Sequence, residues 1–287
     1  VKRWGSFSCP RRETLKPSAI FALMAFLFLL PSLAGGQTWR FPSPSDLTLA
    51  QAQSASGVSA EEAPSLKGLP RAIAADQKPI WLFPIRAAEG HHWKPALAVT
   101  LATTGLVFLD SRDAPHFRRT DAFGGFNRAA SGRNTMIGMA AVPLATLLAG
   151  WAGHNSYAEN TALQAGEAAA DSQLIALGMK FASRRLRPSD INPSGDFGHT
   201  WYKSNARLGF DSGFPSGHTI TAFSIATVFA ERYRRHRWVP WVAYGAATLV
   251  GFSRITLQSH FPSDVFAGAA LGYSVSHFIV LRRQRGD

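Results

Sequence analysis

Five apolar segments of helical length constrain the fold of this 287-residue sequence more than any other feature. A sixth segment, residues 161–181, is also helical in length but more polar, and it carries Glu167 and Asp171. Runs that alternate polar and apolar residues, which are typical of strands, do not stand out. The sequence therefore predicts an all-α fold, a helical bundle of about six helices. The five apolar segments are residues 95–109, 136–153, 219–230, 238–252 and 265–281.

These segments differ in whether they are long enough to cross a membrane. A spanning helix needs about 20 apolar residues. Residues 136–153 and 265–281 come close to that length, whereas residues 219–230 fall short. Basic clusters at 231–237 and 282–285 are separated by two segments, so both clusters would lie on one side, as the positive-inside rule expects. We therefore expect a partly membrane-embedded bundle; the alternative is a soluble bundle with solvated basic loops.

The amino-terminal part of the sequence has the composition of a leader followed by a linker. Basic residues within positions 2–16, an apolar run at 19–33 and small residues at 34–36 are typical of a secretory signal peptide. The alternative is an uncleaved membrane anchor. Residues 37–78 are rich in Ala, Ser, Gln, Pro and Gly and have little periodicity. We predict a signal peptide over 1–36, a flexible linker over 37–80 and a helical domain over 81–287.

Charge and cysteine content limit the classes of partner and site. Thirty Lys and Arg against 18 Asp and Glu give a net charge of +12, which favours anionic partners. The single cysteine, Cys9, excludes an internal disulfide and a Cys-rich zinc site. His91 and His92 have no carboxylate or cysteine at ligand spacing, so no metal is expected there. The basic residues flank apolar segments instead of alternating with aromatic ones, so we expect no nucleic-acid partner.

Two short stretches contain residues suited to binding an anion. Lys180 and Arg187 are seven residues apart and would share a helix face, and Pro188 should end that helix near Arg187. In the stretch 213–219, Ser216 suits an N-cap and Gly217 permits close approach to a helix N-terminus, where anions bind. His218 would lie in the first turn and is able to donate a proton. Each stretch alone also fits an ordinary capped or basic helix end.

A third stretch adds a guanidinium and a second imidazole. Arg254 is able to form two hydrogen bonds to a phosphate. His260 and Asp264 have the i, i+4 spacing that lets a carboxylate orient an imidazole if the turn is helical. Two histidines, three cations, a helix N-terminus and an orienting carboxylate are together the parts of a phosphoryl-transfer site.

The three stretches together read K-x6-RP, PSGH and SR-x5-H-x3-D, in that order. This pattern resembles the signature of the phosphatidic acid phosphatase type 2 and vanadium haloperoxidase superfamily, over about residues 95–281. The resemblance implies that Lys180, Arg187, Ser216, Gly217 and Arg254 bind phosphate. It also implies three catalytic residues and no metal or other cofactor: His260 as the nucleophile that becomes phosphohistidine, Asp264 as its orienting carboxylate, and His218 as the general acid.

Arg184 and Arg185 fall in the unspecified part of the first motif. We expect them to be solvated or to contact lipid headgroups.

The predicted function is hydrolysis of phosphate esters, on lipid phosphates or lipid pyrophosphates at the outer face of the inner membrane. The alternative is a soluble periplasmic acid phosphatase with small phosphate esters as substrates, in which no segment after the signal peptide spans a membrane. A vanadate-dependent haloperoxidase and a lipid-binding envelope protein without activity are weaker alternatives.

Overall fold

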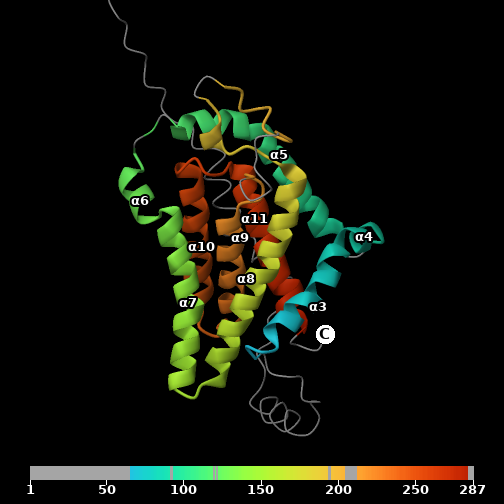
Figure 1. The fold of residues 1–287 in the computed structure, drawn as a ribbon, viewed down its shortest axis with the longest axis vertical. Helices are drawn as coiled ribbons and strands as arrows, with labels where there is room; N and C mark the ends of the chain where they lie inside the picture. The colour runs from blue at the N-terminus through green and yellow to red at the C-terminus, as the bar shows by residue number, and fades with distance from the viewer. Residues whose placement is uncertain are drawn as a thin grey trace, which may run out of the picture.

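The computed structural model describes residues 65–90, 93–118, 120, 122–192, 195–203 and 212–283. Every regular element in these residues is helical, so the all-α prediction is confirmed for them (Figure 1). The predicted signal peptide and most of the predicted linker lie outside the described residues. The elements are α3 (Leu69–Trp81), α4 (Phe83–Ala88), α5 (Trp93–Arg118), α6 (Gly124–Ala129), α7 (Gly132–Ala152), α8 (Ser156–Ser183), the 3-10 turn η1 (Pro188–Asp190), α9 (Gly217–Arg232), α10 (Trp238–Thr256), α11 (Pro262–Val275), the π-helical turn η2 (Ser276–Val280) and α12 (Leu281–Arg283).

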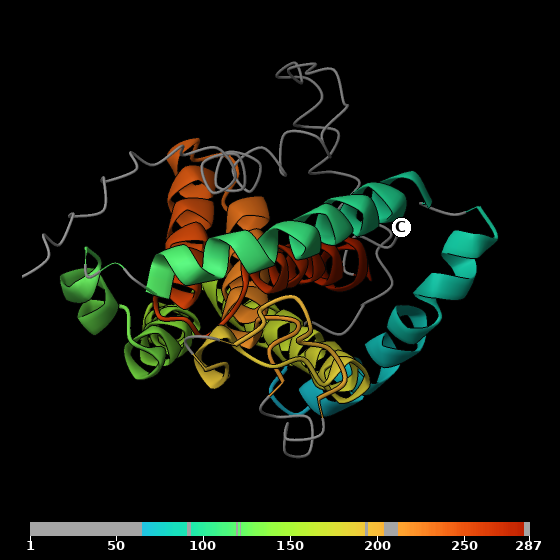
Figure 2. The same cartoon turned by 90° about the horizontal axis from the view of Figure 1, so that it is seen from above.

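Helix α9 is the centre of the bundle and packs against α8, α10 and α11 (Figure 1). Small residues allow the backbones to approach closely. A Cβ atom added at Gly272 of α11 would lie 2.3 Å from the Ile220 carbonyl oxygen of α9, and one at Gly268 would lie 2.8 Å from the Ser216 carbonyl oxygen. Glycine is therefore required at both positions to seat α11 against the start of α9. Helix α5 crosses these helices at the upper end of the bundle (Figure 2).

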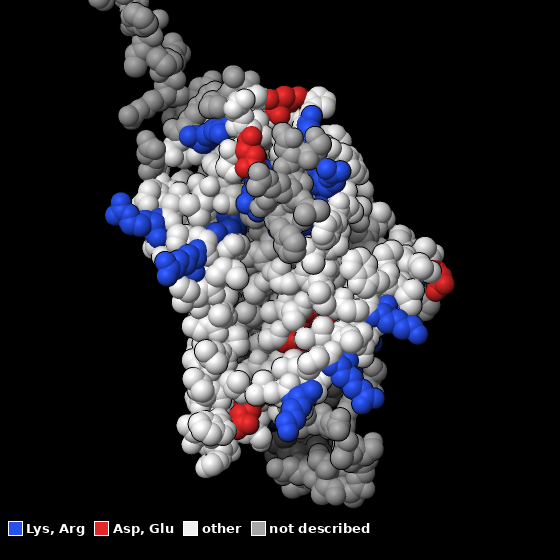
Figure 3. All heavy atoms as spheres, viewed as in Figure 1, with Lys and Arg blue, Asp and Glu red and all other residues white. Residues whose placement is uncertain are grey.

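Two helical stretches are long and apolar enough to cross a membrane, Gly132–Ala152 and Pro262–Arg283. They differ in how far the rest of the protein covers them. Within the 18-residue apolar window of each stretch, 6% is buried in the first stretch and 72% in the second. Helix α7 exposes Ile137, Leu144, Leu148 and Trp151. Figure 3 shows its surface as uncharged below the first turn. The fold therefore carries a contiguous apolar face on α7, of a kind that marks membrane or protein contact.

The predicted linker is wrong at its carboxyl-terminal end. Residues 69–81 form α3, which packs along α8, so the helical domain begins before residue 81. Ile73, Asp76, Gln77 and Ile80 have the i, i+3, i+4, i+7 spacing of one helix face, and Asp76 and Ile80 are buried. The overall composition of residues 37–78 hid this short amphipathic pattern.

Candidate active site

The three sequence stretches meet at the upper end of the bundle in Figure 1. Lys180 lies in the last turn of α8, Ser216 to His218 begin α9, and Arg254 lies in the last turn of α10. Arg187 and His260 occupy the loops that follow α8 and α10. The convergence is electrostatic as well as spatial. Burial lowers the pKa of His260, and the nearby charges of Lys180 and Arg187 lower it further, against the opposing effect of Asp264.

Helix α8 ends earlier than the sequence predicted. It stops at Ser183, because Arg184 adopts a left-handed backbone conformation (φ 43°) as the C-cap. Arg187 is extended, and its backbone N–H donates to Asp190 Oδ2 over 3.1 Å. Lys180 and Arg187 therefore do not share a helix face, and the turn after Ser183 brings Arg187 toward His260 instead.

The tautomer of His260 follows from one hydrogen bond. The side chain is 5% exposed, and Nδ1 lies 2.6 Å from the Gly213 carbonyl oxygen. Because a carbonyl oxygen only accepts, Nδ1 carries the proton, and Nε2 of the neutral ring keeps its lone pair. Nε2 is therefore the ring nitrogen of His260 that is able to accept a proton or form a new bond.

The expected hydrogen bond from Asp264 to His260 is not formed. Asp264 Oδ2 lies 3.7 Å from Nδ1, which is too far for a hydrogen bond, and it accepts from the Phe261 backbone N–H at 2.8 Å. The physical reason is that α11 begins only at Pro262, so His260 lies in an irregular loop and the helical i, i+4 geometry does not apply. Asp264 holds the loop, and the Gly213 carbonyl holds the imidazole.

Arg185 is the residue that sequence reasoning placed wrongly. It is 1% exposed and pairs with Asp264 Oδ1 at 2.5 Å and with Asp110 Oδ2 at 2.6 Å. Its guanidinium lies between the rings of Trp201 and Phe261, 4.5 and 4.3 Å from their centroids. It is therefore neither solvated nor a headgroup contact. Arg185 follows α8 directly and links it to Asp110 of α5 and Asp264 of α11. Asp110, directly after the apolar segment 95–109, was the available signal for a buried partner.

The second imidazole lies beside the start of α7. His218 Nε2 donates to the Gly132 carbonyl oxygen over 3.2 Å, and Arg254 donates to the Ala130 carbonyl oxygen from Nη2. Burial lowers the pKa of His218 to about 4, and the charge of Arg254 adds to this effect. In the absence of an anion His218 is therefore neutral at pH 7. The turn over residues 130–132 is a part of the site that the motifs did not include.

Ser216 and Gly217 form the floor of the site. Ser216 is the residue before α9, as predicted, but its side chain does not cap the helix. Its hydroxyl accepts from Thr219 Oγ1 at 2.9 Å, and its backbone N–H donates to the Asp264 carbonyl oxygen at 3.0 Å. A Cβ atom at Gly217 would lie 3.9 Å from Lys180 Nζ. Glycine here keeps the space beside the lysine open for an anion.

An apolar cavity of about 390 Å³ opens beside this floor, between α7, α8 and α9. Gly217 and His218 form its polar end, and Gln173 donates from Nε2 to the Gly217 carbonyl oxygen at 2.7 Å. The remaining lining is mostly small or apolar: Met136, Ala169, Ala170 and Thr221. A ligand with an anionic head and an apolar tail would find both environments side by side.

Known proteins resemble the part of the chain that carries these motifs. Residues 161–286 match the model of the PAP2 superfamily. A lipid A 4'-phosphatase of Porphyromonas gingivalis is 36% identical over 95 residues, which cover 33% of this chain and 39% of that protein. A lipid A 1-phosphatase of Rhizobium etli is 38% identical over 101 residues, covering 35% and 41%.

The matches are partial in length. The chain spans less than half of the length of these curated relatives. A solved transmembrane PAP2 type phosphatidylglycerolphosphate phosphatase from Bacillus subtilis has a TM-score of 0.41 and 22% identity, and the alignment covers 74% of this chain and 96% of that one. The resemblance that the three motifs indicated is confirmed by the family match over residues 161–286.

Proposed function

We propose that the protein is a phosphoric monoester hydrolase that acts on lipid phosphates through a phosphohistidine on His260. The observation that carries the proposal is the tautomer of His260. Its Nδ1–H donates to the Gly213 carbonyl, which leaves the Nε2 lone pair on a ring that feels the charges of Lys180 and Arg187, and Arg254 acts on the neighbouring His218. The lipid A phosphatases related to this domain support the same reaction class.

In the first step, Nε2 of His260 attacks phosphorus. The P–Nε2 bond forms, the bond from phosphorus to the ester oxygen breaks, and its electron pair leaves with that oxygen. Lys180, Arg187 and Arg254 hold the phosphoryl oxygens, and the Gly213 carbonyl stabilises the positive charge that develops on the ring. His218 gives a proton to the departing alkoxide. Water then attacks phosphorus, neutral His218 takes its proton, and phosphate leaves with His260 restored.

His218 must be protonated for the first step although its pKa is about 4 in the free protein. A bound phosphate brings up to two negative charges next to the ring, and nearby negative charge favours the imidazolium. Substrate binding would therefore raise the pKa of His218, which burial lowers in the free protein. The free and bound states of the protein would differ by one proton on His218.

Three features favour a lipid over a small soluble ester. The cavity beside His218 is mostly apolar, α7 exposes an apolar face, and two helical stretches are long enough to span a membrane. We place the protein in the inner membrane with the site facing the periplasm, in agreement with the signal peptide expected over residues 1–36. The substrate phosphate would sit at His218 and His260, with its apolar chains against α7.

The test is phosphate release by the purified full chain in detergent. The substrates are lipid A, phosphatidic acid, a lipid pyrophosphate and the soluble esters p-nitrophenyl phosphate and glucose 6-phosphate. We expect turnover of at least one lipid at ten or more times the kcat/KM of the soluble esters, and none with His260→Ala. Hydrolysis of the soluble esters alone would support the periplasmic acid phosphatase, and halide oxidation that requires added vanadate would support the haloperoxidase.

A further inference from the structure

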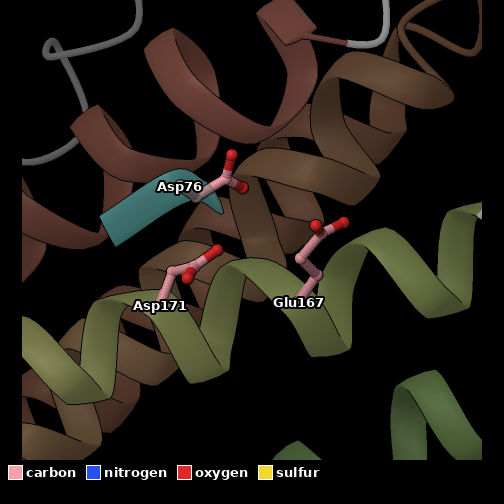
Figure 4. A group of neighbouring side chains, drawn as sticks. All are labelled: Asp76, Glu167 and Asp171. Atoms are coloured by element: carbon pink, nitrogen blue, oxygen red, sulfur yellow. The ribbon is translucent and has the colours of Figure 1, made fainter. Parts of the chain in front are cut away.

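A second polar cluster lies away from the candidate active site, where α3 packs on α8. Asp76 of α3 and Glu167 and Asp171 of α8 point toward one another (Figure 4). One carboxylate oxygen of each lies within 4.8 Å of the others, and the three residues are 3%, 1% and 0% exposed. Asp171 precedes Lys180 by nine residues, roughly 13 Å along the helix axis. The cluster is therefore distinct from the phosphate site.

The cluster carries more negative charge than its protein partners neutralise. Arg283 pairs with Asp76 Oδ1 at 2.6 Å through Nη1 and with Glu167 Oε1 through Nη2. Gln77 donates from Nε2 to Asp171 Oδ1 at 2.7 Å, which adds no charge. Three carboxylates and one guanidinium leave two negative charges among these residues. Burial of unpaired charge is costly, so either bound protons or a further positive group must offset it.

Two oxygens in the cluster have no hydrogen-bond donor among the residues that the structure describes. They are Asp76 Oδ2 and Asp171 Oδ2, and both are buried. On each of these two carboxylates the other oxygen is already engaged, by Arg283 or by Gln77. The protein thus fixes each of the two side chains by one oxygen, and both carboxylates point toward the centre of the cluster (Figure 4). A buried carboxylate oxygen of this kind needs a partner that compensates for the loss of water, such as a proton or a cation.

We propose that Asp76, Glu167 and Asp171 bind a divalent, oxygen-seeking cation, Ca²⁺ or Mg²⁺. The donor set is carboxylate oxygen only, which these cations prefer. The two positive charges of such a cation would neutralise the cluster. A single proton shared between Asp76 and Asp171 would leave one negative charge buried. The ion would join α3 to α8, and Arg283 would close the cluster from the carboxyl-terminal end of the described chain.

Trp81 makes the proposal directly measurable. Its indole Nε1 donates to Gln77 Oε1 at 3.2 Å, and the same Gln77 side chain donates to Asp171. A terbium ion in the Ca²⁺ position would therefore lie near an indole that is able to sensitise its emission. With chelator-treated full chain in detergent, we expect tryptophan-sensitised terbium emission that saturates at about one ion per chain and is displaced by excess Ca²⁺.

Three variants separate this site from adventitious binding. Asp171→Asn removes one ligand charge and should abolish the saturable emission. Trp81→Phe should lose most of the emission but keep the Ca²⁺-dependent stabilisation described below. Glu89→Gln makes the same change from carboxylate to amide at an exposed position and should behave as wild type. Equal emission from wild type and Asp171→Asn would overturn the proposal.

Thermal unfolding supplies an independent readout. At a hundredfold excess over Kd, Ca²⁺ or Mg²⁺ should raise the Tm of the wild type by about 5–10 °C. The shift should fall below about 1 °C in Asp171→Asn. That variant relieves repulsion in an acidic cluster and should fold; if it does not, the wild type and Trp81→Phe decide. A wild type with neither sensitised emission nor a Tm shift would mean that protons neutralise the cluster, and the cation site would be wrong.

Discussion

Two charged clusters built on the same helix, α8, carry opposite surpluses. Near its carboxyl-terminal end, the cations Lys180, Arg185, Arg187 and Arg254 outnumber the carboxylates Asp110 and Asp264, which pair with Arg185, and Asp190, which accepts from the Arg187 backbone. Farther down, three carboxylates face one guanidinium, that of Arg283, within the described part of the chain, which leaves two negative charges among these four side chains if all are ionised. The first surplus matches a phosphate dianion and the second matches a divalent cation.

The comparison shows how a buried charge surplus points to a ligand. In the upper cluster Arg185 pairs with both acids, Asp110 and Asp264, and the charges of Lys180 and Arg187 act on His260. In the lower cluster Arg283 pairs with Asp76 and Glu167, whereas the described hydrogen-bond donor to Asp171 is the uncharged amide of Gln77. In each cluster, the ion pairs between protein side chains determine the sign of the charge that is left over.

The largest effect is expected from a variant that removes the proposed nucleophile of the upper cluster and keeps its cations. His260→Ala removes the nucleophile and leaves all four cations in place. We expect kcat to fall by roughly 10⁴-fold or more while inorganic phosphate still binds. The measurements are phosphate release and competitive binding of phosphate, with circular dichroism as the folding control. Residual turnover within tenfold of wild type would remove His260 from its assigned role.

Arg185→Met tests the two ion pairs that Arg185 makes with Asp110 and Asp264 in the upper cluster. This change leaves Asp110 and Asp264 buried without a cation, so we expect a loss of about 3–5 kcal/mol of unfolding free energy, measured by denaturant titration. Arg185→Lys should recover only part of the loss, because a lysine ammonium does not form the same two-armed pairing between two rings. Arg184→Met is the matched control at an exposed position and should cost far less.

The general acid is tested by the leaving group. His218→Ala should lower the rate on alkyl phosphates by about 10²–10⁴-fold, because an alkoxide requires a proton as it departs. An activated aryl phosphate leaves without that help and should lose far less. The readout is the slope of log kcat/KM against leaving-group pKa for wild type and variant. Equal losses on both classes of ester would refute the assignment of His218.

The smallest expected effect concerns pH. Protonation of His260 removes its nucleophilic lone pair, so the acid limb of kcat/KM reports its pKa, which burial lowers below the usual 6.5. Lys180→Met removes a positive charge that disfavours the imidazolium, so that pKa should rise. The acid limb should move to higher pH by a few tenths of a unit to about one unit. A shift to lower pH would contradict the placement of Lys180 beside His260.

The sequence predicted the elements that depend on local pattern. Helices near 95–109, 136–153, 161–181, 219–230, 238–252 and 265–281 all form, because continuous apolar or amphipathic stretches determine them. The motif residues Lys180, Arg187, His218, Arg254 and His260 also converge at one end of the bundle, where the helices carrying the motifs begin or end.

Contacts between distant residues were not predictable in the same way. Arg185 looked like a surface cation because its partners, Asp110 and Asp264, are 75 and 79 residues away in sequence. The Gly213 carbonyl was missed as the partner of His260 because a backbone oxygen has no sequence signature. The lower cluster depends on α3, whose short amphipathic pattern was hidden in a polar, Ala-rich stretch.

The most direct test of the central claim is the position of phosphate on the trapped enzyme. The full chain is mixed with a substrate, quenched in alkali within the first turnover, and digested for mass spectrometry and phosphorus NMR. Because the Gly213 carbonyl engages Nδ1, we predict phosphate on His260 at Nε2 and no label in His260→Ala. Label on Nδ1, label on another residue, or rapid turnover without any labelled histidine would contradict the account.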